Sequence, residues 1–462
     1  MIQPVYRERS SATSEYLAEI AHTKRLLECW EADSEFRTAL QQDPRAIARS
    51  YGLQSDAEAL RPLWDDSVES DRPVSRAVQR YRAFVLEKLR HRDELRQTSR
   101  PRSSHFHAWR QRQMARTVSQ LGSAKAHGIV HPLAAFELSK GCSVGCWFCG
   151  VSAPKLGDIF TYTDANRGLW RDVCRVWREE IGPAASQGFL YWASDPLDNP
   201  DYEKFACDYH ELCGTFPQTT TAIPLRDVAR TKRLLKLSSE RGCLLDRFSV
   251  LTPKILKRIH REFTPEELTF VELVMQLRKE TSSKAVAGRA LERALKTMDE
   301  SDIETSTIAC VSGFLINMVE GTIKLISPRP ASAEDPLGYR VYGQGVFSNA
   351  DEFREQLKRL TSAQVMPSTV SVDLPVALRS DLRWKIDDRG LNLESTYVRL
   401  TFDGLPKIKL ETMGALLAEG RHTASSLALE LDSDLATTFL ILNRMLSAGA
   451  LEEHPERVPV TV

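Results

Sequence analysis

The chain has 462 residues, which is enough for about three domains with a large hydrophobic core. Lys and Arg number 62, as do Asp and Glu, so the formal net charge is zero and the excess of positive charge that general nucleic-acid binding requires is absent. The N-terminal residues hold no apolar stretch, and the longest apolar run, 308–319, is interrupted by Ser312 and Gly313. We therefore expect a cytoplasmic protein that binds neither nucleic acid nor membrane.

Residues 1–70 are typical of an N-terminal region of short helices. Phe36 and Leu40 are spaced to share one helical face. Asp43 before Pro44 predicts a helix start, because a capping carboxylate then precedes proline in the first turn. Gly52 stands where a left-handed C-terminal cap is expected.

Residues 71–130 are predicted to be an Arg-rich helical linker. Two interpretations of this charge remain open: a solvated helix between two domains, or a contact surface for an acidic peptide or partner. The arginines concerned are Arg72, Arg76, Arg80, Arg82, Arg90, Arg92, Arg96, Arg100, Arg102, Arg110, Arg112 and Arg116.

Residues 131–345 alternate short β-rich runs with helix-length segments. Such alternation predicts βα units, a parallel sheet and an open or partial barrel. Residues 346–378 are a connecting segment. The predicted strands are 133–138, 188–192, 218–223, 247–251, 307–311 and 322–326, and the predicted helical segments include 161–181, 201–214, 227–241 and 264–298.

Residues 379–462 form a separate C-terminal region that resembles a winged helix. Two extended runs, 396–402 and 407–410, precede three helical patterns. A DNA-reading helix would be basic, yet Arg444 is accompanied here by several acidic residues, so DNA binding is disfavoured. The last helix has an apolar stripe, closed by Gly449, that consists of Leu435, Phe439, Leu442 and Leu446.

Three of the nine cysteines fall within eight residues, in the pattern C-x3-C-x2-C after the first predicted strand. Cys142, Cys146 and Cys149 can wrap one face of an iron–sulfur cube and leave one iron open to a small molecule. A disulfide framework is not expected in a long chain without an export signal. A zinc site completed by His131 is the alternative interpretation.

The spacing, with Phe148 as the aromatic residue before the last cysteine, resembles the radical S-adenosylmethionine (SAM) enzymes. The resemblance implies a partial (β/α)6 barrel, one [4Fe-4S] cluster and SAM chelated by the open iron. It places Asp195, in Ala193-Ser-Asp-Pro-Leu197, against the SAM ammonium, although this turn lacks the family's glycine pair and its Glu. Thr221 and Ser249 occupy strand positions where the family makes polar contacts to SAM.

A closer resemblance is to the peptide epimerases of the proteusin (polytheonamide) type, which act on ribosomally made precursor peptides. The segments that carry it are 139–153, 191–202, 309–318, 325–328 and 338–342, and residues 31–64 resemble the helical leaders of nitrogen-fixation-like precursor peptides. The implied partners are a precursor peptide with its leader and a cellular reductant such as flavodoxin or ferredoxin.

The implied reaction abstracts a Cα hydrogen with a 5′-deoxyadenosyl radical and returns hydrogen to the opposite face from a thiol. Relatives of this type carry a cysteine directly after the Ser-Pro pair, where this chain has Arg329. Cys310, in a predicted inner strand, and Cys243 are the alternative donors. A different radical reaction, such as oxidation or cross-linking, also remains open, as does a metal-containing regulator. No cysteine follows Cys310, so a second cluster is not expected.

Overall fold

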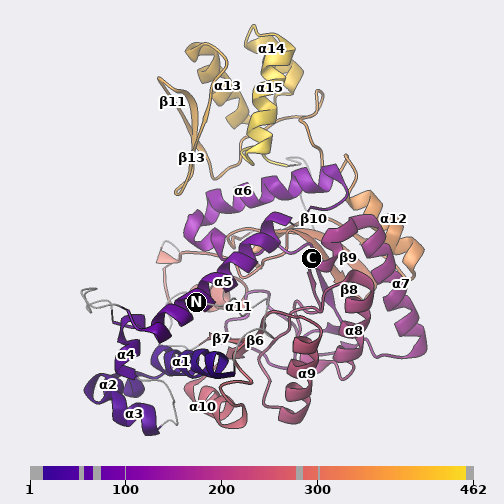
Figure 1. Ribbon diagram of the computed structural model, residues 1–462. Helices are drawn as coiled ribbons and strands as arrows, with labels where there is room; N and C mark the ends of the chain where they lie inside the picture. The colour runs from indigo at the N-terminus through magenta and orange to yellow at the C-terminus, as the bar shows by residue number, and fades with distance from the viewer. Residues whose placement is uncertain are drawn as a thin grey trace.

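The computed structural model describes residues 14–50, 57–65, 74–98, 100–276, 285–299, 302–333 and 335–453 (Figure 1). Helices and strands are mixed along the chain, so the architecture is α/β, as predicted. The sheets lie in the middle of the molecule, with the N-terminal helices at one side and the C-terminal region above them (Figure 1). Within the described ranges, no helix combines the length and apolar character that crossing a bilayer requires.

The N-terminal region is a cluster of helices, as the sequence predicts. Phe36 and Leu40 are both buried on one helical face. The Asp43 carboxylate accepts a hydrogen bond from the Ala46 amide at 2.9 Å, which confirms the predicted helix start. The predicted cap Gly52 lies outside the described residues. The helices are α1 (Ser14–Ala32), α2 (Ser34–Gln42), α3 (Pro44–Ser50) and α4 (Ala57–Leu60).

Two long helices, α5 (Arg76–Thr98) and α6 (Ser104–His127), follow, and α6 corrects both interpretations for three of the twelve arginines. Arg110, Arg112 and Arg116 are buried in α6, with 0%, 3% and 3% of their surface exposed. Helix α6 lies between the central sheet and the C-terminal region (Figure 1). Its arginines are therefore neither solvated nor open to an acidic partner, because they bind groups within the chain.

The central sheet is mixed, with the strand order β10-β9-β8-β1-β4. Strand β1 is parallel to β4 and β8, whereas β9 is antiparallel to β8 and β10. The predicted strand at 322–326 exists but does not continue the parallel series, because a tight turn joins it directly to β8. The strands are β1 (Ala134–Glu137), β4 (Gly188–Phe189), β8 (Gly313–Asn317), β9 (Thr322–Pro328) and β10 (Tyr339–Val346).

The predicted strand 307–311 is wrong, since β8 begins only at Gly313. The Thr307 hydroxyl donates to the Gly338 carbonyl and accepts from the Ala309 amide, so local side-chain bonds replace a strand ladder here. Cys310 consequently lies in an irregular segment before β8 and not in a strand.

A second sheet consists of three parallel strands in the order β5-β6-β7. The prediction of a helical segment over 264–298 is wrong, because this range contains strand β7 and the short helix α11. Val271, Leu273 and Met275 are buried in alternation, which is the period of a strand. The elements are β5 (Thr220–Thr221), β6 (Asp246–Val250), β7 (Val271–Met275) and α11 (Arg289–Ala294).

Amphipathic helices cover the outer faces of these sheets (Figure 1). Phe136 of β1 packs edge-on against Trp170, Trp177 and Tyr209, all fully buried. The predicted segments 161–181, 201–214 and 227–241 are confirmed as helices. The helices are α7 (Asp164–Ile181), α8 (Tyr202–Cys213), α9 (Val228–Glu240), α10 (Pro253–Glu262) and α12 (Ala350–Leu360).

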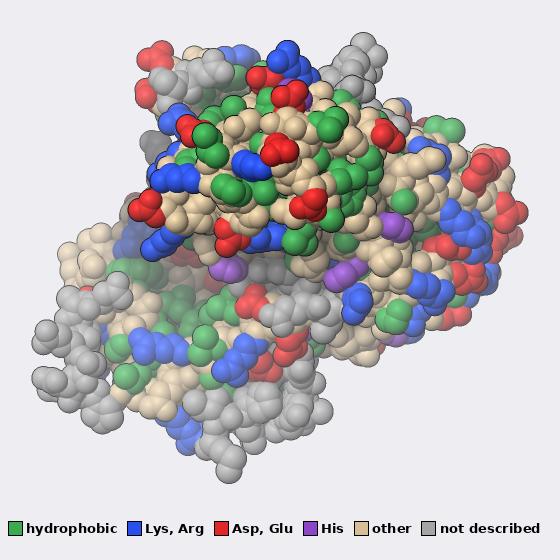
Figure 2. Space-filling model, turned by 90° about the horizontal axis from the view of Figure 1, so that it is seen from above, with side chains coloured by type: hydrophobic (Ala, Val, Ile, Leu, Met, Phe, Trp, Pro, Cys, Tyr) green, Lys and Arg blue, Asp and Glu red, His purple; other side chains and the backbone are tan. Residues whose placement is uncertain are grey.

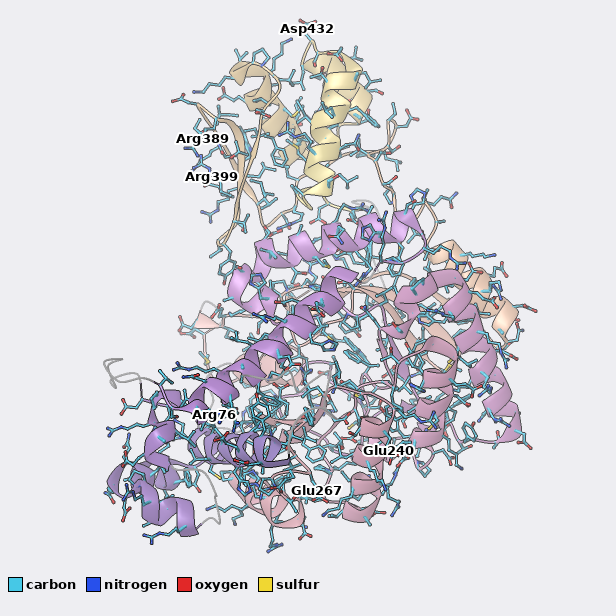
Figure 3. All side chains as sticks on the ribbon, viewed as in Figure 1. Arg76, Glu240, Glu267, Arg389, Arg399 and Asp432 are labelled. Carbon is cyan, nitrogen blue, oxygen red and sulfur yellow. The ribbon has the colours of Figure 1, made fainter. Side chains whose placement is uncertain are left out.

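The C-terminal region has its own hydrophobic core beneath an antiparallel sheet. The predicted extended run 407–410 is helical. Of the predicted apolar stripe, Leu442 and Leu446 are buried and Phe439 packs against the core, whereas Leu435 is 43% exposed. Arg389 and Arg399 project from the sheet away from the helices (Figure 3). The elements are β11 (Arg383–Asp387), β12 (Gly390–Glu394), β13 (Arg399–Phe402), α13 (Lys407–Glu419), α14 (Ala424–Glu430) and α15 (Leu435–Ser447).

Apolar side chains are exposed on the outer surface of this C-terminal region, where green atoms gather in Figure 2. Ile408, Leu429 and Leu440 have 73%, 82% and 62% of their surface exposed.

Candidate functional site

The three motif cysteines lie in one loop at the carboxyl end of β1. The loop leaves β2 (Ser139–Lys140) and returns to β3 (Asp158–Ile159), which pair antiparallel and close its base. Gly141 has φ +83°, and a Cβ there would stand 2.3 Å from the Lys155 carbonyl oxygen. Only glycine therefore allows the backbone at the start of the loop to approach Lys155 this closely.

All three thiols are free and partly exposed. The Val144 amide donates to Cys142 Sγ at 3.5 Å, and the Ala153 amide donates to Cys149 Sγ at 3.3 Å. Burial raises the pKa of Cys142 and of Cys146 to about 11 each, and the neighbouring motif thiols add to the rise at Cys146. A bound cation is needed to turn such thiols into thiolates at neutral pH.

The thiols suit an iron–sulfur cube better than a single ion. Among the described residues, no three His, Cys, Asp or Glu side chains gather closely enough to hold one metal ion. In a cube each thiolate binds its own iron, so the sulfurs need not converge on one point. Soft thiolates on a partly exposed loop are the donors that such clusters take. The residues present therefore fit a cluster.

His131, the candidate fourth zinc ligand, lies before the amino end of β1, whereas the cysteine loop follows its carboxyl end. Its Nδ1 is 2.8 Å from the Ser312 hydroxyl, and its carbonyl accepts a hydrogen bond from Arg110. The zinc interpretation that used His131 is therefore wrong.

Asp195 and Thr221, both singled out in the sequence, are in direct contact. The Thr221 hydroxyl donates to Asp195 Oδ1 at 2.8 Å, and the Ala222 amide donates to Asp195 Oδ2 at 2.7 Å. Asp195 follows β4 and Thr221 ends β5, so this bond joins the carboxyl ends of two strands from different sheets. Burial raises the pKa of Asp195 to about 6, since its hydrogen bonds only partly offset the loss of water.

The other two residues predicted to contact SAM, Ser249 and Phe148, lie on other elements. Ser249 is half-buried on β6, on the same strand face as Arg247. The Phe148 ring stands edge-on to Trp147 within the cysteine loop, with ring centroids 5.4 Å apart. Neither residue is part of the Asp195–Thr221 contact.

Cys310 lines a cavity of about 410 Å³, called here the inner cavity, whose walls include Phe189 of β4 and Arg247 of β6. Val151 of the cysteine loop lines the same cavity, and so does Trp192. Burial raises the pKa of Cys310 to about 12, so this thiol keeps its S–H bond at neutral pH. The cavity therefore brings a protonated thiol and the cysteine loop to one space.

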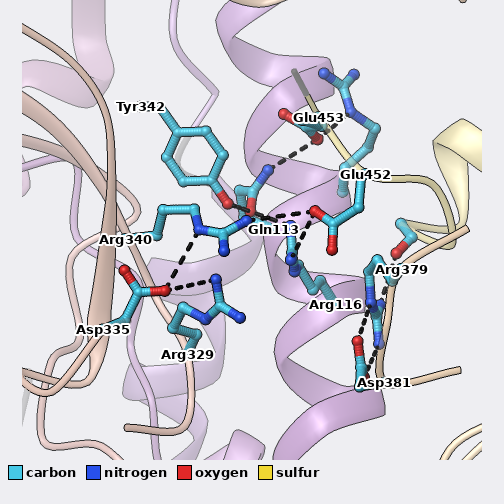
Figure 4. A network of polar contacts seen from close by, with 12 residues as sticks. Gln113, Arg116, Arg329, Asp335, Arg340, Tyr342, Arg379, Asp381, Glu452 and Glu453 are labelled. Carbon is cyan, nitrogen blue, oxygen red and sulfur yellow. Dashed lines mark hydrogen bonds and ion pairs between the residues drawn. The ribbon is translucent and has the colours of Figure 1, made fainter. Parts of the chain in front are cut away.

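The alternative donor Cys243 does not line this cavity, and neither does Arg329, which stands where relatives carry a cysteine. Cys243 lines a different cavity, next to α9, and its Sγ is 3.8 Å from Asp246 Oδ1. Arg329 forms an ion pair with Asp335 at 2.6 Å and belongs to a polar network at α6 (Figure 4). Its guanidinium is thus held apart from the inner cavity.

This polar network fixes the C-terminal segment to the central sheet (Figure 4). Arg112 Nε and Gln113 Nε2 both donate to Glu453 Oε1 at 2.9 Å. The Tyr342 hydroxyl of β10 donates to Gln113 Oε1 at 2.9 Å, and Arg116 and Arg340 reach Glu452 Oε2 at 3.4 Å and 3.3 Å. The buried arginines of α6 thus act as a structural hub.

Two carboxylates that the sequence analysis did not single out support the site. Glu137, at the end of β1, accepts from the Ala193 amide at 2.8 Å and from Asn317 Nδ2 at 3.2 Å. Asp198 accepts from the Ser143 amide of the cysteine loop at 2.9 Å and from Arg226 at 2.7 Å. They hold the Asp195 turn and the cysteine loop in place.

Comparison with known proteins identifies a close relative. The chain is 40% identical over 466 aligned residues to the uncharacterized protein y4wI of Sinorhizobium fredii, covering 96% of this chain and 89% of that protein. The chain belongs to the y4wI family. The relative's description names no activity, so membership of the y4wI family assigns none to this chain.

Two further comparisons add no function to the y4wI family. No protein-family model matches the chain. The crystal structure of BtrN in complex with AdoMet and 2-DOIA aligns with 42% of this chain and 72% of that chain, at a TM-score of 0.29 and 10% identity. A TM-score of 0.29 is too low to establish a shared fold.

Sequence signals existed for some of the supporting residues of this y4wI family member. Glu137 is an acidic residue within the apolar run 133–138, which indicates a buried carboxyl. Asp198 lies three residues after Asp195, in the same predicted turn. Arg289 contacts the cysteine loop from a segment that was predicted to be one long helix, so no signal identified it.

Proposed function

We propose that this protein is a radical SAM enzyme, in which Cys142, Cys146 and Cys149 hold one [4Fe-4S] cluster. The observation that carries the proposal is the partly exposed three-cysteine loop at the carboxyl end of a parallel strand, beside the buried Asp195–Thr221 contact. Ligands of open α/β sheets bind at that edge. When bound, the cluster and SAM supply a 5′-deoxyadenosyl radical that abstracts hydrogen from a substrate.

The residues of this chain bind and orient SAM. Asp195 accepts hydrogen bonds from the SAM ammonium, and Thr221 fixes the orientation of its carboxylate. A positive ligand lowers the raised pKa of Asp195, so binding favours the ionised carboxylate. Ser249 and Phe148 supply the remaining contacts to SAM, a polar one from β6 and an aromatic one from the cysteine loop.

We further propose that the substrate is a ribosomally made precursor peptide and that the reaction inverts an L residue to D. Cys310 donates a hydrogen atom to the planar Cα from the face opposite to the abstraction. The S–H bond breaks, the new Cα–H bond forms, and one electron with one proton from a cellular reductant such as flavodoxin or ferredoxin restores the thiol. The position of Cys310 in the inner cavity supports this role.

Another radical modification, such as oxidation or cross-linking, is the second candidate. It is favoured by Arg329, which stands where the epimerases carry a cysteine and is engaged with Asp335 outside the cavity. Product mass separates the two candidates, because inversion leaves the mass unchanged in H2O and introduces deuterium from an exchangeable thiol in D2O.

The test is co-expression of the protein with the precursor peptide encoded nearby, in D2O, followed by chiral amino-acid analysis. We expect D residues that carry deuterium at Cα. Cys310→Ala abolishes them, whereas Cys243→Ala, the matched control, leaves their yield unchanged. Modified peptide with altered mass but only L residues would establish the second candidate, and unchanged D-residue yield in Cys310→Ala would remove Cys310 from the reaction.

A further inference from the structure

Arg289, the first residue of the short helix α11, forms several hydrogen bonds with the cysteine loop. The Arg289 amide donates to the Cys149 carbonyl at 3.0 Å. Its Nη1 donates to the Cys146 carbonyl at 3.4 Å, and its Nη2 donates to the Ala153 carbonyl. One residue thus binds three carbonyls of the loop, two of which belong to proposed cluster ligands.

The residue before Arg289 is packed directly against the loop. Gly288 has φ +51°, and a Cβ at this position would stand 2.5 Å from the Gly150 carbonyl oxygen and 2.6 Å from that of Cys149. Only glycine brings the start of α11 this close to the loop backbone. The contact is therefore tight at Cys149 and Gly150.

A second arginine of α11 holds the loop from the side. The Arg293 guanidinium lies over the Trp147 ring, 5.1 Å from its centroid. A cation over an indole face is attracted by the ring electrons. Trp147 directly follows Cys146, so backbone and side-chain contacts converge on the same stretch of the loop.

We propose that Arg289 is a positioning residue that holds the cysteine loop in the conformation its ligands need. The backbone at Cys146 and Cys149 fixes where their Cα–Cβ bonds point, and the planar guanidinium binds two carbonyls at once. No ion pair links Arg289 to a carboxylate among the described residues, so its donors serve the loop. The inference deepens the proposed function and rests on it for the ligand role of the thiols.

The test compares Arg289→Gln, Arg289→Lys and, as matched control, Lys296→Gln, which removes a nearby exposed positive charge. The first readout is the rate at which iodoacetamide alkylates Cys142, Cys146 and Cys149 in metal-free protein, with buried Cys174 and Cys213 as internal references. Loss of hydrogen bonds to a charged group frees the loop, so Arg289→Gln raises these rates about tenfold. The second readout is the rate of iron loss to a chelator after anaerobic reconstitution.

Arg289→Lys is expected to fall between wild type and Arg289→Gln in both readouts, because an ammonium cannot match the guanidinium fork. Lys296→Gln should match wild type. Equal alkylation and iron-loss rates in wild type and Arg289→Gln would overturn the inference, and if Arg289→Gln does not fold, equal rates in Arg289→Lys do so. Wild-type protein that takes up no iron would contradict the proposed function, while the alkylation rates would still decide the role of Arg289.

Discussion

At the scale of single residues, the site depends on carboxylates that are buried without a cation. Asp195 is 5% exposed and Glu137 is 7% exposed, and neither forms an ion pair with a described residue. Burial without a paired charge is costly, so such groups persist where a ligand or a fixed geometry requires them. We attribute the burial of Asp195 to a ligand and the burial of Glu137 to the geometry that it fixes.

Asp195→Asn is the first residue-scale prediction. The amide oxygen still accepts from the Leu197 amide, so the turn is retained, but the negative charge that we propose to pair with the SAM ammonium is lost. We expect SAM to bind at least about tenfold more weakly to reconstituted protein, as measured by calorimetry, because the lost hydrogen bond is to a charged group. Asp227→Asn, at the exposed start of α9, is the control, and equal affinity in all three proteins would contradict the assignment.

Glu137 gives a prediction for pH. Burial raises its pKa from the ordinary 4.5 to about 7, so the folded protein retains a proton that the unfolded chain has lost between these values. The free energy of unfolding therefore falls as pH rises through this window and is constant above it. Glu137→Gln reproduces the uncharged form and removes this fall, which amounts to about 3 kcal/mol.

Urea unfolding at pH 5 and pH 8 measures the Glu137 effect. The variant should gain stability relative to wild type at the higher pH, whereas the exposed Glu411→Gln should show no such change. A difference between variant and wild type that is the same at both pH values would show that Glu137 is ionised in the folded protein throughout.

At the scale of elements, α6 is the structural hub of the molecule. It packs against β9 on one side and α15 on the other, and its arginines bind the chain on both sides. The Arg112–Glu453 pair is buried on both partners, each with 3% of its side chain exposed. Removal of one partner leaves an uncompensated buried charge.

Glu453→Ala is therefore expected to lower the free energy of unfolding by about 3 kcal/mol, since buried pairs lose that much when one partner is deleted. Asp403→Ala, which breaks the exposed Arg444–Asp403 pair, should cost less than about 1 kcal/mol. Chemical denaturation of both variants measures the difference. Equal and small losses would mean that the α6 network does not hold the C-terminal region to the sheet.

Elements with a clear period could be predicted from the sequence, and contacts between distant elements could not. Helices α7, α8 and α9 follow from apolar spacing, and Asp43 from capping chemistry. Strand β7 was missed because its five residues lie within a polar, helix-like stretch. The burial of Arg110, Arg112 and Arg116 depends on carbonyls and carboxylates far away in the sequence, so charge alone suggested a solvated surface.

In the candidate site, too, local features could be predicted from the sequence and contacts between distant segments could not. The cysteine spacing marked the loop from local sequence, and Asp195 was predicted from the resemblance of its turn to that of the radical SAM family. The Asp195–Thr221 bond, the Asp198–Ser143 bond and the Arg289 contacts join segments far apart in the chain, and their partners are set by the fold. The position of Cys310 in a cavity beside Val151 likewise follows from the fold.

At the scale of the whole molecule, the carboxyl ends of β1, β4 and β5 converge on the cysteine loop, and the inner cavity lies beside it. The N-terminal helices and the C-terminal region flank the sheets (Figure 1). The proposed function places the chemistry at this edge, where the three thiols lie.

The most direct test is to measure 5′-deoxyadenosine released from SAM by anaerobically reconstituted protein with a strong reductant. We predict release by the wild type and by Cys207→Ala, and none by the variant in which Cys142, Cys146 and Cys149 are all replaced with Ala. Equal release from that triple variant, or no release from wild-type protein loaded with iron and sulfide, would contradict the account.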